Sequence, residues 1–121
     1  MGSALNWFEI PVTDMARAKR FYSAVLQSDL REDAMNGMHL AVLPYQDGVG
    51  GALIQSPQHI PSAQGTIVYL NAGDDLDGAI ARVEAAGGQV SMGRTLVTEQ
   101  IGSIAIFLDS EGNRVAFHSR N

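Results

Sequence analysis

The sequence predicts a single α+β domain in which the order strand, helix and three strands occurs twice. Apolar residues alternate with period two near the start of the chain and again after residue 65. Each alternating stretch leads into an amphipathic helical pattern, and short strand-like stretches with glycine-rich turns follow each helix. Since a tandem repeat of elements fits within 121 residues, one domain with one core is expected.

The first half-repeat covers about residues 4–56. Phe8, Ile10 and Val12 alternate with Trp7, Glu9 and Pro11, which predicts a strand over residues 5–12. Apolar residues then recur every three or four positions, so a helix is expected over residues 14–26, capped by Thr13 or Asp14. Three short strands are expected after it, over residues 30–34, 38–44 and 51–55, with a glycine-rich turn before the last.

The second half-repeat covers about residues 65–119 and follows a proline-containing linker over residues 57–64. A strand is expected over residues 66–72, and a helix that begins at Asp74, Asp75 or Asp77 and ends at Gly87-Gly88. The expected strands after it are two short pieces at 89–92 and 96–98, then 103–108 and 114–118, with a turn over 109–113.

The composition argues against several classes of partner. The net charge of −5 disfavours nucleic acid and anionic lipid, and no stretch is apolar for long enough to span a membrane. The chain has no cysteine, which excludes disulfides and thiolate chemistry. No signal peptide is visible at the N-terminus, so the cytoplasm is the expected location.

Three stretches resemble motifs of one family. PVTDMARAKRFYSAVL is similar to the first strand-to-helix motif of the vicinal oxygen chelate superfamily, which contains glyoxalases, bleomycin-resistance proteins and dioxygenases. DDLDGAIARVEAAGGQV is similar to its second such motif, and FLDSEGNRVAFHS to its closing hairpin. The resemblance implies a mixed sheet curled into an open barrel around a cavity, a homodimer, and a divalent metal held by one His or Glu from each of four strands.

The residues that fall on the metal-ligand positions of this family are not metal ligands. The positions correspond to Trp7, a residue within 51–55, Val68 (with an alignment error of about one residue) and Ala116. None offers the carboxylate or imidazole that divalent cations require, so no cofactor is predicted. This departure weighs against metal-dependent isomerase or dioxygenase chemistry.

Other residues are candidates for a ligand site. Glu9 shares a strand face with Trp7, so it is predicted to act as a catalytic base or to bind a cation, as well as to contact the ligand. The alternative is a carboxylate at the rim of the sheet or one paired with a basic residue. Trp7 offers an aromatic wall for a planar or cationic ligand. Val68 and Leu70 are expected to line the pocket while Tyr69 packs on a helix, and a one-residue error in the alignment would instead turn Tyr69 and Asn71 toward the pocket. The remaining predicted contacts are Ala116, His39 and His118, and both histidines are alternatively explained as hydrogen-bonded structural residues.

Three functions remain open at this level. The favoured one is a protein that binds a small molecule in the barrel cavity without the usual metal. The second is a glyoxalase-type lyase or isomerase, or a dioxygenase-like enzyme, that acts on a small oxygenated metabolite through Glu9, either with a non-standard metal held with His39 or His118 or without a metal. The third is a non-catalytic module that uses the fold for protein contact.

Overall fold

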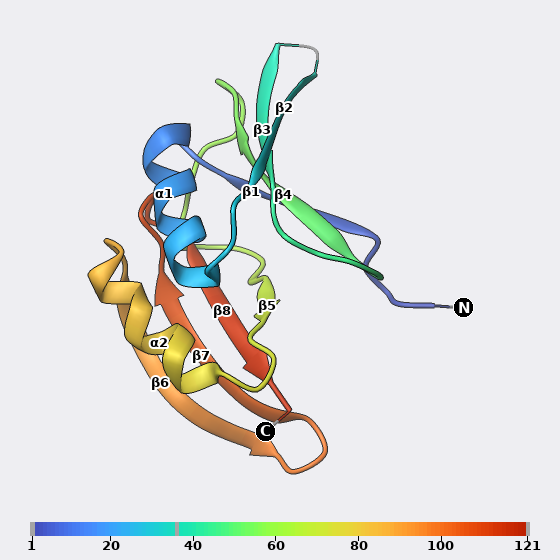
Figure 1. The fold of residues 1–121 in the computed structure, drawn as a ribbon, viewed down its shortest axis with the longest axis vertical. Helices are drawn as coiled ribbons and strands as arrows, with labels where there is room; N and C mark the ends of the chain where they lie inside the picture. The colour runs from blue at the N-terminus through green and yellow to red at the C-terminus, as the bar shows by residue number, and fades with distance from the viewer. Residues whose placement is uncertain (1, 36, 121) are drawn as a thin grey trace.

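The computed structural model describes residues 2–35 and 37–120, with Met35 by its backbone alone, and confirms the predicted α+β class. Two four-stranded mixed sheets and two helices form an architecture that is not a closed barrel (Figure 1). The first half contains β1 (Trp7–Pro11), α1 (Met15–Leu26), β2 (Arg31–Met35), β3 (Met38–Val42) and β4 (Gly50–Gln55). The second contains β5 (Tyr69–Asn71), α2 (Leu76–Ala85), β6 (Gln89–Thr98), β7 (Gly102–Leu108) and β8 (Arg114–Ser119).

The two sheets have the same topology. Their strand orders are β1-β4-β3-β2 and β5-β8-β7-β6, and in each the first strand pairs in parallel with the last. The other neighbours pair antiparallel, as consecutive strands joined by short turns do. The strand order thus confirms the internal repeat that the sequence predicts.

The helices form because their apolar residues lie on one face, and both pack into a shared core. Asp14 caps α1 by accepting a hydrogen bond from the backbone N–H of Arg17 at 3.1 Å. Phe21 of α1 stacks against Phe107 of β7, and Figure 1 shows α1 and α2 close together beside the second sheet. Within the described residues, neither helix has the length and apolar character that a membrane crossing requires.

Two strand predictions need correction. The pieces predicted at residues 89–92 and 96–98 belong to one ten-residue strand, β6, whose pairing with β7 shifts register in three places. These irregularities interrupt the apolar alternation, which explains why the sequence pattern divides the strand. The strand predicted over residues 66–72 shortens to β5, Tyr69–Asn71.

A one-residue insertion distinguishes the second half from the first. The N–H of Val12 donates to the carbonyl of Ile54 at 2.9 Å, and the N–H of Ala72 donates to the carbonyl of His118 at 2.8 Å. These matching bonds make Val12 and Ala72 equivalent. The helix cap Asp75, however, follows Ala72 one residue later than the helix cap Asp14 follows Val12. The extra residue lies beside Gly73, whose φ of 61° suits glycine.

This insertion reverses the predicted orientation of the fifth strand. Counted from the matching bonds, Trp7 corresponds to Ile67 and Glu9 to Tyr69. Leu70 belongs to the helix-packed core, and Val68 packs against that core. Tyr69, which was expected to pack on a helix, instead lies 48% exposed on the opposite face.

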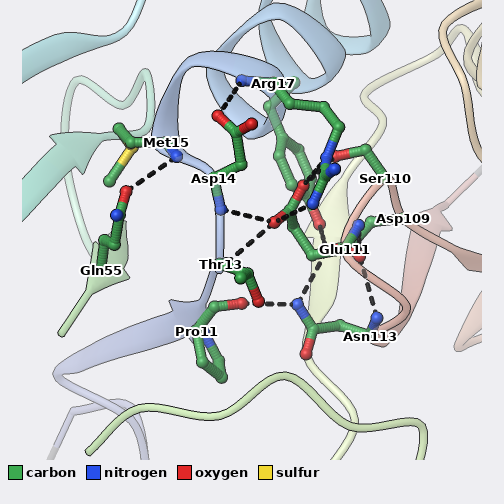
Figure 2. A network of polar contacts seen from close by, with 11 residues as sticks. Pro11, Thr13, Asp14, Met15, Arg17, Gln55, Asp109, Ser110, Glu111 and Asn113 are labelled. Atoms are coloured by element: carbon green, nitrogen blue, oxygen red, sulfur yellow. Dashed lines mark hydrogen bonds and ion pairs between the residues drawn. The ribbon is translucent and has the colours of Figure 1, made fainter. Parts of the chain in front are cut away.

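The turn between β7 and β8, residues 109–113 and here named the closing turn, joins the two halves (Figure 2). The Asn113 side-chain amide donates to the Pro11 carbonyl at 2.7 Å and to Asp109 at 3.0 Å. The Glu111 carboxylate accepts the backbone N–H groups of Thr13 and Asp14 and pairs with Arg17. The closing turn therefore fixes the position where β1 leads into α1.

Candidate functional site

A cleft of about 1060 Å³ lies between the two halves. The first half contributes part of β1, the end of α1 and the connection between β3 and β4, and the second contributes the segment 66–71. β1 and β5 are each paired on one side only, with β4 and β8 respectively, so no shared sheet closes the seam between them. A cleft of this size accommodates a drug-sized organic molecule.

The cleft is aromatic and acidic. Phe8, Tyr45 and Tyr69 line it, and Trp7 contacts Tyr45 edge to face with ring centroids 6.4 Å apart. Its acidic side chains are Glu9 and Asp47, whereas no basic residue of the described ranges lines it. This combination of aromatic surface and negative charge is complementary to a flat cation.

Two adjacent glycines in β4 make room for these aromatic rings. A Cβ on Gly50 would lie 2.4 Å from the Tyr45 ring, and a Cβ on Gly51 would lie 2.5 Å from the Phe8 ring. Both separations are far shorter than a van der Waals contact, so any larger residue would displace the rings. The first residues of β4 thus shape one wall of the cleft.

A smaller pocket of about 150 Å³, here named the side pocket, adjoins the cleft. Glu9, Thr66 and Val68 line both cavities. The linker closes the side pocket through Ile60, Ser62 and Gln64, and β8 contributes Arg114. The Ser62 N–H donates to the Asn113 side chain at 3.0 Å, which holds the linker against the closing turn.

Three of the predicted site residues, Glu9, Val68 and Leu70, line the cleft, and a fourth, Trp7, lines neither cavity but contacts the cleft residue Tyr45. Glu9 is exposed and lines both cavities, and Trp7, 42% exposed, lies on the same face of β1 beside Tyr45. Val68 and Leu70 point toward the core, yet they also line the cleft. They reach it because β1 and β5 do not pair with each other, which leaves the edge of the core open between these strands. Their roles in binding, and the catalytic role of Glu9, remain predictions.

The other three predicted site residues line neither cavity. His39 lies on the helix side of β3, where Nε2 interacts with Glu32, whose carboxylate also binds Lys19. His118 shares a strand face with Ala116, as predicted, but its Nε2 interacts with the Ile101 carbonyl at 2.5 Å. Ala116 is fully buried in β8. The structure therefore does not bring Glu9, His39 and His118 together.

Some cleft residues were predicted only as an alternative, and others do not appear among the sequence predictions. Tyr69 and Asn71 were the alternative pair for the cavity face, and strand alternation selects them once the insertion near Gly73 is known. Tyr45 and Asp47 lie in the glycine-rich turn, and nothing in its local sequence indicates that it borders a ligand cavity. Arg114 directly follows the closing turn, and its position beside Glu9 depends on contacts between the two halves.

The strongest electrostatic effects belong to the closing turn rather than to the cleft. Burial alone would raise the pKa of Glu111, but hydrogen bonds from Arg17 and from the backbone of Asp14 and Thr13 lower it to about 2. Burial raises the pKa of the Tyr22 hydroxyl, as does Asp109, to which it donates at 2.7 Å. Glu111 is thus an anion and Tyr22 a neutral donor at neutral pH.

The donor chemistry at the family's metal positions does not fit a divalent cation. Trp7 and its equivalent Ile67 have no oxygen or imidazole donor, and neither do Ala116 and its equivalent in β4, Ala52. In addition, within residues 2–35 and 37–120 no group of three His, Cys, Asp or Glu side chains is arranged to hold a metal ion.

Comparison with known proteins identifies the family. The sequence model of the Glyoxalase/Bleomycin resistance protein/Dioxygenase superfamily matches residues 4–117. Since the match covers most of the chain, this protein belongs to that superfamily, as the resemblance in the sequence implied. None of the curated proteins matches the chain.

Solved structures share the fold. A glyoxalase/bleomycin resistance protein from Albidiferax ferrireducens T118 is 17% identical with a TM-score of 0.74, and the alignment covers 98% of this chain and 100% of that one. TnmS3, an antibiotic binding protein from Streptomyces sp. CB03234, is 24% identical with a TM-score of 0.71 and coverages of 98% and 97%. A glyoxalase I mutant from Zea mays is 20% identical with a TM-score of 0.69, and this chain covers 45% of its length.

Proposed function

We propose that this protein binds a small organic ligand in the cleft between its two halves, without the metal that the superfamily usually uses. The cleft itself carries the proposal, because it combines the volume of a ligand site with aromatic walls and two acids that form no ion pair with the described part of the chain. The antibiotic binding protein TnmS3, which has the same fold, gives an example of binding as a function of this architecture.

The side chains of the cleft favour a planar cationic ligand. Tyr45 and Tyr69 are 50% and 48% exposed, so each ring offers a face for stacking. Glu9 and Asp47 place negative charge next to them, and neither carboxylate forms an ion pair with a described residue. An aromatic cation would gain both stacking and charge attraction at this position.

Calorimetric titration with two probes of opposite charge tests this function. We expect N-methylquinolinium to bind saturably and naphthalene-2-sulfonate, an anion of similar shape, to bind much more weakly. Tyr69→Ala and Glu9→Gln should each weaken N-methylquinolinium about three- to tenfold, as expected for loss of one cation–π or charge contact. Glu99→Gln, an exposed acid that lines neither cavity, is the matched control. Equal binding of the two probes would contradict the proposal.

The enzyme alternative requires a different outcome. Its metal-dependent form would need Glu9 to act with a metal, and neither His39 nor His118 lines the cavities that contain Glu9. Elemental analysis of protein purified without chelator should find no stoichiometric nickel, zinc, manganese or iron. A stoichiometric metal would favour the enzyme over the metal-free binder.

We further propose a homodimer located in the cytoplasm. Large apolar side chains are exposed on β1, on β6 and on the β6–β7 connection, including Trp7, Leu96 and Ile101, and the edge strands β1 and β5 each have an unpaired side. The lack of cysteine fits a reducing compartment. Sedimentation at micromolar concentration should give twice the chain mass of 12.9 kDa, and a species of 12.9 kDa alone would exclude the dimer.

A further inference from the structure

The side pocket contains two opposite charges that do not neutralise each other. Glu9 lines it from β1 and Arg114 from β8, and no ion pair joins them. Four other cations of the chain, Arg17, Lys19, Arg82 and Arg94, are each paired with an acid. The Arg114 side chain, like those of Arg20, Arg31 and Arg120, has neither an ion-pair nor a hydrogen-bond partner among the described residues, and of these four cations Arg114 is the one that lines the side pocket.

Uncharged donors and acceptors complete this lining. The side chains of Gln64 and Thr66 have no hydrogen-bond partner in the described part of the chain. Ser62 accepts the Gln64 N–H through its hydroxyl oxygen, which leaves its own O–H free to donate. The pocket therefore presents a cation, an anion and several neutral polar groups to one small volume.

The walls of the pocket are held in place by the closing turn. Asn113 is buried, and its side chain bonds the Pro11 carbonyl, Asp109 and the Ser62 N–H at the same time. These bonds fix β1, β8 and the linker relative to one another. The backbone of the pocket walls is therefore preorganised, so little ordering of the main chain opposes binding.

The charge arrangement is particular to this side of the molecule. The turn before β4, residues 45–49, has the same length as the closing turn before β8, so Arg114 at the start of β8 corresponds to Gly50 at the start of β4. The first half thus carries no cation at the matching position. The repeat of the fold does not account for Arg114, which points to a role specific to the side pocket.

We infer that the side pocket binds a small zwitterion, a molecule with one carboxylate and one ammonium group on a chain of a few carbons. Arg114 takes the carboxylate, for which a guanidinium offers paired donors, and Glu9 takes the ammonium. The volume of about 150 Å³ is suitable, since a protein cavity of about this volume is known to hold benzene, a molecule of six heavy atoms. This site is additional to the proposed cleft ligand and shares only Glu9, Thr66 and Val68 with the cleft.

Amide NMR titrations with glycine, β-alanine and γ-aminobutyrate test the inference, with acetate and methylammonium as single-charge probes. At least one amino acid should shift the amides of residues 62–66 and 114–115 saturably in the millimolar range, and more tightly than either single-charge probe. Arg114→Gln should weaken this binding at least about tenfold, and Glu9→Gln should weaken the amino acid but not acetate.

Controls separate this inference from the proposed function. Arg31→Gln removes an exposed cation far from the pocket and should leave amino acid binding unchanged. Arg114→Gln should leave N-methylquinolinium binding in the cleft intact, so either site can fail alone. The inference is wrong if none of the three amino acids binds saturably, or if acetate binds as tightly as all of them. It is also wrong if Arg114→Gln binds the amino acid as tightly as the wild type while its amide spectrum remains folded.

Discussion

Two turns of equal length occupy matching places in the two halves and have opposite surroundings. The closing turn joins β7 to β8, and residues 45–49, here named the cleft turn, join β3 to β4 at the equivalent register. Each has glycine at its fourth position with nearly the same φ, 82° at Gly48 and 86° at Gly112. In the closing turn Asp109 and Asn113 are buried, whereas Tyr45 of the cleft turn is half exposed.

The comparison shows how one turn geometry serves two purposes. In the closing turn, polar side chains face the other half of the molecule and bond to it. In the cleft turn, Tyr45 and Asp47 face an open cavity. The two turns have the same length and nearly the same φ at their fourth residue. Their side chains therefore distinguish the turn that stabilises the fold from the turn that is available to a ligand.

The largest expected effect comes from Asp109→Ala. Its carboxylate accepts the Tyr22 hydroxyl, the N–H groups of Glu111 and Asn113, and the Asn113 amide, all at 3.0 Å or less. Removing it leaves buried donors unpaired, so the free energy of unfolding should fall by about 3 kcal/mol or more. Urea denaturation measures this loss, and Asp47→Ala in the cleft turn should cost about 0.5 kcal/mol or less. Equal losses in both variants would remove the contrast between the turns.

The next largest effect is a dependence of the free energy of unfolding on pH, which is due to Glu111. Because its pKa falls from 4.5 in the unfolded chain to about 2 in the fold, its contribution to stability is present above pH 4.5. This contribution is lost as the pH falls from 4.5 through 2. We expect a loss of about 2 kcal/mol across this window, reduced from the full shift because Arg17 is half exposed to solvent.

Denaturation of Glu111→Gln at several pH values isolates this effect. The variant should be less stable than the wild type at pH 7, and the difference should shrink toward pH 2. The matched variant of the cleft turn, Asp47→Asn, should follow the wild-type profile. If the stability of the wild type and that of Glu111→Gln change with pH in parallel, Glu111 does not cause the pH dependence.

A smaller effect should be equal in the two turns. Both Gly48 and Gly112 adopt a positive φ, and a Cβ at either position would meet no atom within 4 Å. Alanine at each should therefore cost only backbone strain, about 1 kcal/mol. Thermal unfolding of Gly48→Ala and Gly112→Ala measures both costs. A much larger loss for Gly112→Ala would show that the turn backbones are not equivalent.

The smallest effect on stability should come from Tyr45→Ala. Its ring is half exposed and contacts Trp7 edge to face, so the free energy of unfolding should change by about 0.5 kcal/mol. Binding of N-methylquinolinium should nevertheless weaken several-fold. If Tyr45→Ala loses stability but binds N-methylquinolinium as tightly as the wild type, Tyr45 stabilises the fold and does not contact the ligand.

The sequence predicted those parts of the structure that depend on local chemistry. Helix α1, its Asp14 cap and the positive φ of Gly87 after α2 follow from residues that are neighbours in the chain. The orientation of β5 was predictable only to about one residue, because an insertion beside Gly73 changes the strand register without changing the apolar pattern.

The site was less predictable because its geometry depends on distant contacts. The helix-side orientation of His39 was readable in principle, since it alternates in step with the core residues Ala41 and Leu43. By contrast, nothing in the neighbouring sequence indicates that His118 contacts the Ile101 carbonyl or that Arg114 and Glu9 line the same pocket. The closing turn was recognised as a turn, but its bonds to the first half connect residues about 100 positions apart.

This separation along the chain has a consequence for synthesis. During translation α1 leaves the ribosome long before Glu111 exists, and Glu111 lies 97 residues after the backbone N–H of Asp14 that it accepts. The nascent first half must therefore remain without these contacts until the last hairpin is made. Contacts of such high sequence separation slow folding, so a chain truncated before the closing turn should populate a loosely packed, chaperone-dependent state.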